Sequence, residues 1–227
     1  MGAMDRRSAV RVGRRCGLVR ETMRAIALVI VMTSCARAIA PLRGTPAPPS
    51  SIPRFELQGS RRLTFRWEFI QDPMVARGEG VARLTAPDSA RLDFFIDGGF
   101  GSGYALVFGE RIVAPGGDLV RDMLPSAPML WAAVGRLAVP PAIDTAATVD
   151  AGVLRADIGR DPRWRATIEG GRMTMLEHVE DGKVSESVVR SAEGVVRYTN
   201  RRARRTLRIT VTREETVPGF DASIWRP

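Results

Sequence analysis

The sequence is short of the residues that perform most catalytic chemistry. Its 227 residues contain a single histidine, His178, and two cysteines, Cys16 and Cys35. One histidine excludes a multi-histidine metal centre, and a Ser-His-Asp triad would have to use His178 itself. Lysine is equally scarce, because Lys183 is the only one. We therefore expect neither an enzyme nor a cofactor or metal site.

Hydrophobic residues make up 44% of the chain, which excludes an intrinsically disordered protein. Lys and Arg total 34 against 25 Asp and Glu, a net charge of +9. Nearly all of the basic residues are arginine, which we attribute to the codon usage of a GC-rich genome rather than to a binding function. Composition alone therefore gives no function.

The N-terminal 34 residues have the organisation of an export signal. Seven arginines are followed by the apolar run 25–32 and by Thr33-Ser34-Cys35. Eight apolar residues are too few for a bilayer core, which requires about 20. A basic stretch, a short apolar run and small residues are the parts of a secretory signal. Translation starting at Met23 instead of Met1 would make this signal more compact.

Thr33-Ser34-Cys35 resembles the lipobox of bacterial lipoproteins, with Met32 where leucine is usual. The resemblance implies that Cys35 is acylated and becomes the mature N-terminus. Ala36, rather than aspartate, follows the cysteine, which in that family implies the outer membrane. The alternatives are ordinary cleavage near Ala38 and a buried amphipathic helix with an incidental cysteine.

Removal of residues 1–34 lowers the net charge from +9 to +4 and leaves no disulfide. Residues 35–53 are rich in proline, and we expect an extended tether that holds the protein clear of the lipid headgroups. Residues 54–227 then form one domain, for which we expect a monomer.

Alternating hydrophobic and polar residues indicate strands in this domain. Residues 63–69, 91–97, 163–168 and 207–212 follow a period of two, and Gly109-Glu110, Gly170-Gly171 and Asp181-Gly182 are typical hairpin turns. One polar face per strand favours an antiparallel sheet with one face in water.

Two short helices interrupt this pattern, over residues 119–124 and 129–137. The second helix is apolar nearly all round, so we expect it to pack against the concave face of the sheet. The predicted fold class is mainly β with α: a single-domain curved antiparallel sheet, an unclosed β-barrel, wrapped around a short apolar helix.

This order of elements resembles the LolA/LolB family of lipoprotein carriers, and LolB more closely because LolB is itself a lipoprotein. The resemblance rests on the early Phe65 and Trp67, on Leu130-Trp131 in the helix and on Asp161-Pro162-Arg163-Trp164. It implies a cavity that binds lipid or lipoprotein acyl chains delivered by a periplasmic carrier protein. Phe100 falls where LolB has an apolar loop residue, which implies contact with the membrane. The alternatives are that its ring docks on a carrier protein or reaches back to the core. The residues expected to line the cavity are Phe65, Trp67, Phe69, Leu92, Phe94, Ile96, Leu106, Phe108, Met129, Trp131 and Val134.

Other patterns are weaker. Residues 98–103 are glycine-rich but lack the lysine of a phosphate-binding loop. Asp93 and Asp97 lie on one strand, where a carboxylate pair usually faces water. His178 is expected to be an ordinary strand residue, and the basic run 201–205 a solvated turn or a contact with anionic headgroups rather than a nucleic-acid site.

Two hypotheses remain. The first is an outer-membrane lipoprotein, anchored at the periplasmic face, that binds acyl chains and accepts or inserts lipoproteins as LolB does. The second is a surface-anchored β scaffold with a filled core and a protein partner. A continuous apolar cavity under the helix favours the first, and a filled interior favours the second.

Overall fold

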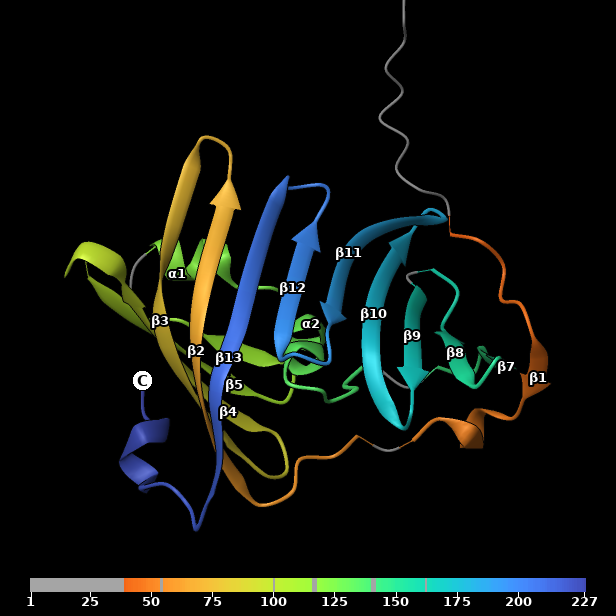
Figure 1. Cartoon of the computed structure of the whole chain (residues 1–227), viewed down its shortest axis with the longest axis horizontal. Helices are drawn as coiled ribbons and strands as arrows, with labels where there is room; N and C mark the ends of the chain where they lie inside the picture. Colours follow the sequence, from red (N-terminus) through yellow and green to blue (C-terminus); the bar gives the residue numbers. More distant parts are fainter. Residues whose placement is uncertain (1–38, 54, 100, 116–117, 140–141, 162) are drawn as a thin grey trace, which may run out of the picture. The chain divides into compact units, whose positions relative to one another are not determined.

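One antiparallel sheet organises the part of the chain that the structure describes. The structure is a computed structural model, and it describes residues 39–53, 55–99, 101–115, 118–139, 142–161 and 163–227. Within these residues 13 strands form one sheet, and sequence neighbours pair at almost every position (Figure 1). The sheet order is β1-β7-β8-β9-β10-β11-β12-β13-β2-β3-β4-β5-β6, so β1 and β6 are two separate edges. The predicted unclosed antiparallel sheet is confirmed.

The strands are short at the two edges and long in the middle. Their bounds are β1 Thr45–Ala47, β2 Ser60–Gln71, β3 Met74–Thr85, β4 Ser89–Ile96, β5 Ser102–Phe108, β6 Arg111–Val113, β7 Thr145–Asp150, β8 Val153–Ile158, β9 Arg163–Glu169, β10 Arg172–Glu180, β11 Lys183–Arg190, β12 Val195–Asn200 and β13 Arg205–Val217. Pairing of β13 with β2, in which Leu207 lies opposite Phe69, joins the last strand of the sheet to the first long one.

Both predicted helices are present. Helix α1 spans Asp118–Met123, and α2 spans Ala127–Ala133, two residues earlier than expected at its start and four at its end. Pro128 occupies the first turn of α2, and Gly135 follows the helix with a φ of 88°. Short 3-10 turns occupy Pro49–Ser51 (η1), Asp97–Gly99 (η2) and Ala222–Trp225 (η3). Among the described residues, no helix is long and apolar enough to cross a membrane.

The core lies on one face of the sheet, against α2. Phe65, Trp67 and Phe94 belong to this core. The Phe94 ring packs edge to face on Phe65 and on Trp67, with ring centroids 5.8 and 5.9 Å apart, respectively. Helix α2 contacts β10, β11 and β12, so it lies over the middle of the sheet. Gly80 lies opposite Phe65 in β2–β3, where a methyl group would overlap the Phe65 ring. The glycine therefore leaves the space that the Phe65 ring occupies.

The proline-rich tether predicted over residues 35–53 is wrong for residues 39–53. Thr45–Ala47 forms β1 and pairs with β7, and the Ile39 amide donates to the Gly182 carbonyl at 3.0 Å. The Arg165 guanidinium donates to the Ala40 carbonyl at 2.6 Å. Proline keeps this segment extended, as expected, but an extended segment also fits the free edge of a sheet, and here it is docked on the domain.

Candidate functional site

An apolar cavity lies between α2 and the sheet, where the sequence predicts it. We call it the α2 cavity. Its lining is Leu63, Phe65, Ala82, Leu92, Phe94, Leu130, Ala133, Val134, Val196, Leu207, Ile209 and Val211. The volume is about 40 Å³. A space of this size holds a few water molecules at most, so the interior is nearly filled in this conformation.

Four of the eleven residues predicted to line a cavity do so, namely Phe65, Leu92, Phe94 and Val134. Five more belong to the same core or pack against it without bordering the cavity: Trp67, Phe69, Met129 and Trp131 are buried, and Ile96 is partly buried. The period-two pattern of β2 and β4 thus identified the correct face of both strands.

Leu106 and Phe108 are the exceptions, because they lie on the opposite face of the sheet. Leu106 pairs with Arg91, whereas its neighbours Ala105 and Val107 face the core. The Phe108 ring packs edge to face on Trp225 of η3 at 6.4 Å. The C-terminal segment packs on the outer face of β5, so both faces of this strand are covered. Residues 105–108 are accordingly all apolar. Periodicity cannot assign a face in such a run.

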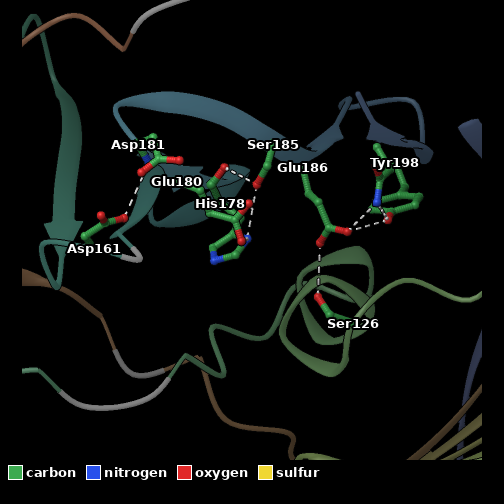
Figure 2. Close-up of polar contacts among 9 residues, drawn as sticks. Ser126, Asp161, His178, Glu180, Asp181, Ser185, Glu186 and Tyr198 are labelled. Atoms are coloured by element: carbon green, nitrogen blue, oxygen red, sulfur yellow. Dashed lines mark hydrogen bonds and ion pairs between the residues drawn. The ribbon is translucent and has the colours of Figure 1, made fainter. Parts of the chain in front are cut away.

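Helix α2 is fixed by few polar contacts. The indole Nε1 of Trp131 donates to the Gly109 carbonyl at 2.7 Å, and the Arg136 guanidinium lies 4.6 Å from the centre of the Trp131 ring. At the other end, the Ser126 hydroxyl donates to Glu186 at 3.3 Å instead of capping the helix (Figure 2). Apolar packing therefore supplies most of what holds α2 on the sheet.

Glu186 belongs to a polar cluster on the core side of β11 and β12. Its carboxylate accepts a hydrogen bond from the Tyr198 hydroxyl at 2.9 Å (Figure 2). It accepts another from the Asn200 amide at 2.7 Å. Burial raises the pKa of the Tyr198 phenol, and the Glu186 charge adds to this rise. The cluster thus places hydrogen-bonded polar groups beside the N-terminal end of α2, where Ser126 contacts Glu186.

His178 lies in a neighbouring cleft with its ring stacked on Trp164, the ring centroids 4.2 Å apart. Its Nδ1 meets the Ser185 hydroxyl at 3.2 Å and Glu180 at 3.8 Å. Both partners approach the same ring nitrogen, so the three side chains are not in the relay order of a catalytic triad. Ser185 is also within 3.2 Å of the His178 carbonyl. These contacts are those of a structural strand histidine, although its side chain is only 16% exposed and is packed rather than solvated as the sequence predicts.

One end of the sheet carries an apolar tip that the sequence analysis missed. Ile70, Met74 and Val75, beside the β2–β3 turn, are 42%, 38% and 55% exposed. The β12–β13 turn lies next to this tip, since Arg205 pairs with Gln71, and it presents exposed Arg201, Arg202 and Arg204. Phe95, near the same end on β4, is 50% exposed. In the alternating pattern Ile70 and Val75 count as ordinary outward residues, so only their exposure reveals the tip.

Cys35 and Phe100, the predicted lipidation site and membrane-contact residue, lie outside the described residues. Phe100 follows η2, which begins directly after β4. The turn η2 therefore leaves the sheet at the end that also carries the β2–β3 turn, since Gly78 of β3 pairs with Ile96.

No protein-family model matches the sequence, and no curated protein matches it. Several solved structures are similar to this structure. A LolA superfamily protein from Nitrosomonas europaea is similar over 78% of this chain and 95% of its own, with a TM-score of 0.52 and 6% identity. A DUF1329 family protein from Desulfovibrio piger (TM-score 0.48, 7% identity) and a Vibrio parahaemolyticus domain named for outer-membrane lipoprotein sorting (0.45, 8%) each cover 74% of this chain and 89% of their own. The first similarity, together with the unclosed sheet around α2, shows that the domain has the LolA/LolB-like fold.

Proposed function

We propose that the protein is a lipid-anchored carrier or acceptor that binds the acyl chains of lipids or lipoproteins in the α2 cavity. The observation that carries this proposal is the wholly apolar lining of that cavity in a LolA/LolB-like fold. An acyl chain gains about 0.8 kcal/mol for each methylene that it buries, so an apolar channel suffices without a charged clamp. No bond is made or broken.

A volume of about 40 Å³ is too small for a long acyl chain, so α2 has to move away from the sheet on binding. Three features support this step. The helix is short, its hydrogen bond at the Ser126 end is long, at 3.3 Å, and its last turn directly borders the cavity through Ala133 and Val134. Burial of the incoming chain replaces the apolar contacts that α2 gives up.

The apolar tip and the basic turn support a membrane-facing role for one end of the sheet. Exposed Ile70 and Val75 would enter the interface, while Arg201, Arg202 and Arg204 would meet anionic headgroups. Ile39 is hydrogen-bonded to Gly182 in the β10–β11 turn, which the antiparallel order places at this same end. A lipidated Cys35 would lie four residues away. Phe100 would contribute a further apolar contact here.

The anchor itself is tested by metabolic labelling with a fatty-acid probe. We expect the wild-type chain to be labelled and to fractionate with the outer membrane, at its periplasmic face. Cys35→Ser should lose the label, because the acylated thiol is gone. Equal labelling of the two would refute the anchor and leave the α2 cavity proposal untouched.

Acyl-chain binding is tested by displacement of a fluorescent fatty acid from the full chain. Ala133→Leu adds bulk to the cavity and should weaken binding about tenfold or more, since one to two kcal/mol of buried apolar area is lost. The matched control is Ala222→Leu, the same change at an exposed position of η3. It should bind as the wild type does.

The alternative is an anchored scaffold with a filled core and a protein partner, and the small cavity favours it. Absence of fatty-acid binding by the wild-type chain would select this alternative. Mass spectrometry of the protein purified from membranes, which would show any lipid bound to it, provides an independent answer.

A further inference from the structure

A second cavity opens where strands β10 and β11 separate. Their pairing runs from Glu180 opposite Lys183 to Met175 opposite Val189 and stops there. A bulge between Met173 and Met175 turns the start of β10 away, so residues 172–174 and 190–192 do not pair with each other. The cleft between them has a volume of about 570 Å³. We call it the arginine cleft.

Three arginines are among the residues that line the arginine cleft, namely Arg155, Arg172 and Arg190, and the Arg190 guanidinium also lies against Gly135 after α2. Among the residues that the structure describes, none of them has a hydrogen bond or an ion pair through its side chain. Other arginines of the molecule are paired, such as Arg62 with Glu215 and Arg165 with Asp157. Glu169 is the acidic residue of the lining, and it is exposed at the rim opposite Arg172.

Two buried polar atoms of the lining lack any partner. The Arg190 Nε and the Thr167 Oγ1 are both inaccessible to solvent and form no hydrogen bond. Thr167 is only 5% exposed, and it lies opposite Arg155 in β8–β9. A buried donor left without a partner costs about 1–3 kcal/mol, so native proteins rarely keep one without a reason. The hydroxyls of Thr174 and Ser191, which also line the cleft, have partners in the Thr167 carbonyl and the Val195 amide.

The positive charges of the cleft also favour binding of an anion. Burial lowers the pKa of Arg190, and the positive charge of Arg172 lowers it further. To a smaller extent the Glu214 carboxylate raises this pKa and the Arg61 charge lowers it, so on balance the charge of Arg190 destabilises the free protein. A bound anion would offset the repulsion between Arg172 and Arg190, and it would give the Arg155 and Arg172 guanidinium groups an acceptor.

We propose that the arginine cleft binds a tetrahedral oxyanion, a phosphate or sulfate group. Arg155 and Arg172 supply charge-assisted donors, and the Thr167 hydroxyl supplies a buried neutral one. Met173, Met175 and Val189 line the same cleft and offer apolar contact to whatever carries the anion. The ligand is therefore either a free oxyanion or the headgroup of a phospholipid. The cleft shares no lining residue with the α2 cavity, so this proposal stands independently of acyl-chain binding.

The test is calorimetric titration of the full chain with inorganic phosphate and with dihexanoyl phosphatidic acid, at constant ionic strength. Arg172→Gln and Arg155→Gln should each weaken binding about tenfold, the loss expected for one charge-assisted hydrogen bond. Arg111→Gln is the matched control, because Arg111 is exposed on the edge strand β6 and also has no partner among the described residues. It should leave binding unchanged.

Thr167→Val separates binding from folding. Removal of an unpartnered buried hydroxyl should leave the thermal midpoint unchanged or raise it, yet weaken phosphate binding several-fold. Equal affinity for the two ligands would identify a free oxyanion, and at least tenfold tighter binding of phosphatidic acid would identify a phospholipid. Absence of binding to both ligands, or an equal loss in Arg111→Gln, would overturn the proposal. So would a Thr167→Val variant that binds as the wild type does.

Discussion

Two regions of the sheet, called wings here, differ in how far the outer face is exposed to water. In the wing formed by β2, β3 and β4, part of the outer face is open to water and carries ion pairs such as Arg66–Glu79 and Arg77–Glu68, in which every side chain is at least 38% exposed. In the wing formed by β8, β9 and β10, the outer face carries Asp157 and Arg165, whose side chains are 11% and 8% exposed. The second pair is buried although it faces away from the core.

The N-terminal segment causes this difference. Residues 39–43 lie over the second wing, where the Ala40 carbonyl accepts from Arg165 and the Arg43 carbonyl accepts from Thr148. Trp164, Ala166 and Ile168 of β9 face the core, and Arg165 and Thr167 on the other face are buried as well, so five consecutive residues are buried. Alternating polar and apolar residues predict that one face of a strand is exposed to water. That prediction is wrong wherever a segment distant in sequence covers the polar face.

The largest expected effect comes from helix α2, which packs over β10, β11 and β12. Trp131→Ala should lower the free energy of unfolding by about 3–5 kcal/mol, because Trp131 is 1% exposed and its indole holds the Gly109 carbonyl. Urea denaturation measures the change. Trp225→Ala, which removes a half-buried tryptophan from the outer face, should cost less than half as much. Equal losses would mean that α2 is not central to the core.

The next effect contrasts the ion pairs of the two wings directly. Asp157→Ala leaves Arg165 buried without its partner and should cost about 3 kcal/mol. Glu79→Ala breaks an exposed pair and should stay within about 0.5 kcal/mol. The same denaturation experiment compares them. A small loss for Asp157→Ala would show that water reaches the second wing.

Removal of the covering segment should give a smaller loss. A chain that begins at Pro48 lacks β1 and the Ala40 and Arg43 acceptors, and we expect its unfolding free energy to fall by about 2 kcal/mol, at roughly 1 kcal/mol or less per net hydrogen bond. Amide hydrogen exchange should show lost protection in β7, which β1 covers. Thr148→Val, which removes only the Arg43 contact, should lose half as much or less. Unchanged exchange in β7 would restore the free-tether interpretation.

The smallest effect on stability belongs to the apolar tip of the first wing. Val75→Asp should change the unfolding free energy by no more than about 0.5 kcal/mol, because Val75 is 55% exposed. It should nevertheless reduce sedimentation of the Cys35→Ser chain with vesicles that contain phosphatidylglycerol. Val149→Asp makes the same change at a 39% exposed residue of β7 and should sediment normally. Equal sedimentation of the two variants would argue against a membrane role for the tip.

Sequence patterns predicted strands β2 and β4 more accurately than β5. The alternation of β2 and β4 identified Phe65, Leu92 and Phe94, and the proline and glycine positions located α2 to within a few residues. Leu106 and Phe108 were assigned to the wrong face because η3, more than 100 residues away in sequence, buries the outer face of β5.

The candidate sites depend even more on contacts between distant residues. The arginine cleft exists because pairing of β10 with β11 stops at Met175, and no local pattern predicts where a ladder ends. Likewise, the volume of the α2 cavity depends on how closely Val134 approaches strands that are remote in sequence. Sequence alone could supply the apolar composition of that cavity but not its size.

The open sheet has one consequence for the behaviour of the protein in solution. Its two edges, β1 and β6, are only three residues long each, and Pro46 removes one of the amide donors of β1. Long exposed edges allow sheets of different molecules to join, which leads to aggregation, and short edges with proline discourage it. The docked proline-rich segment therefore also protects β7 from pairing with another copy of the chain.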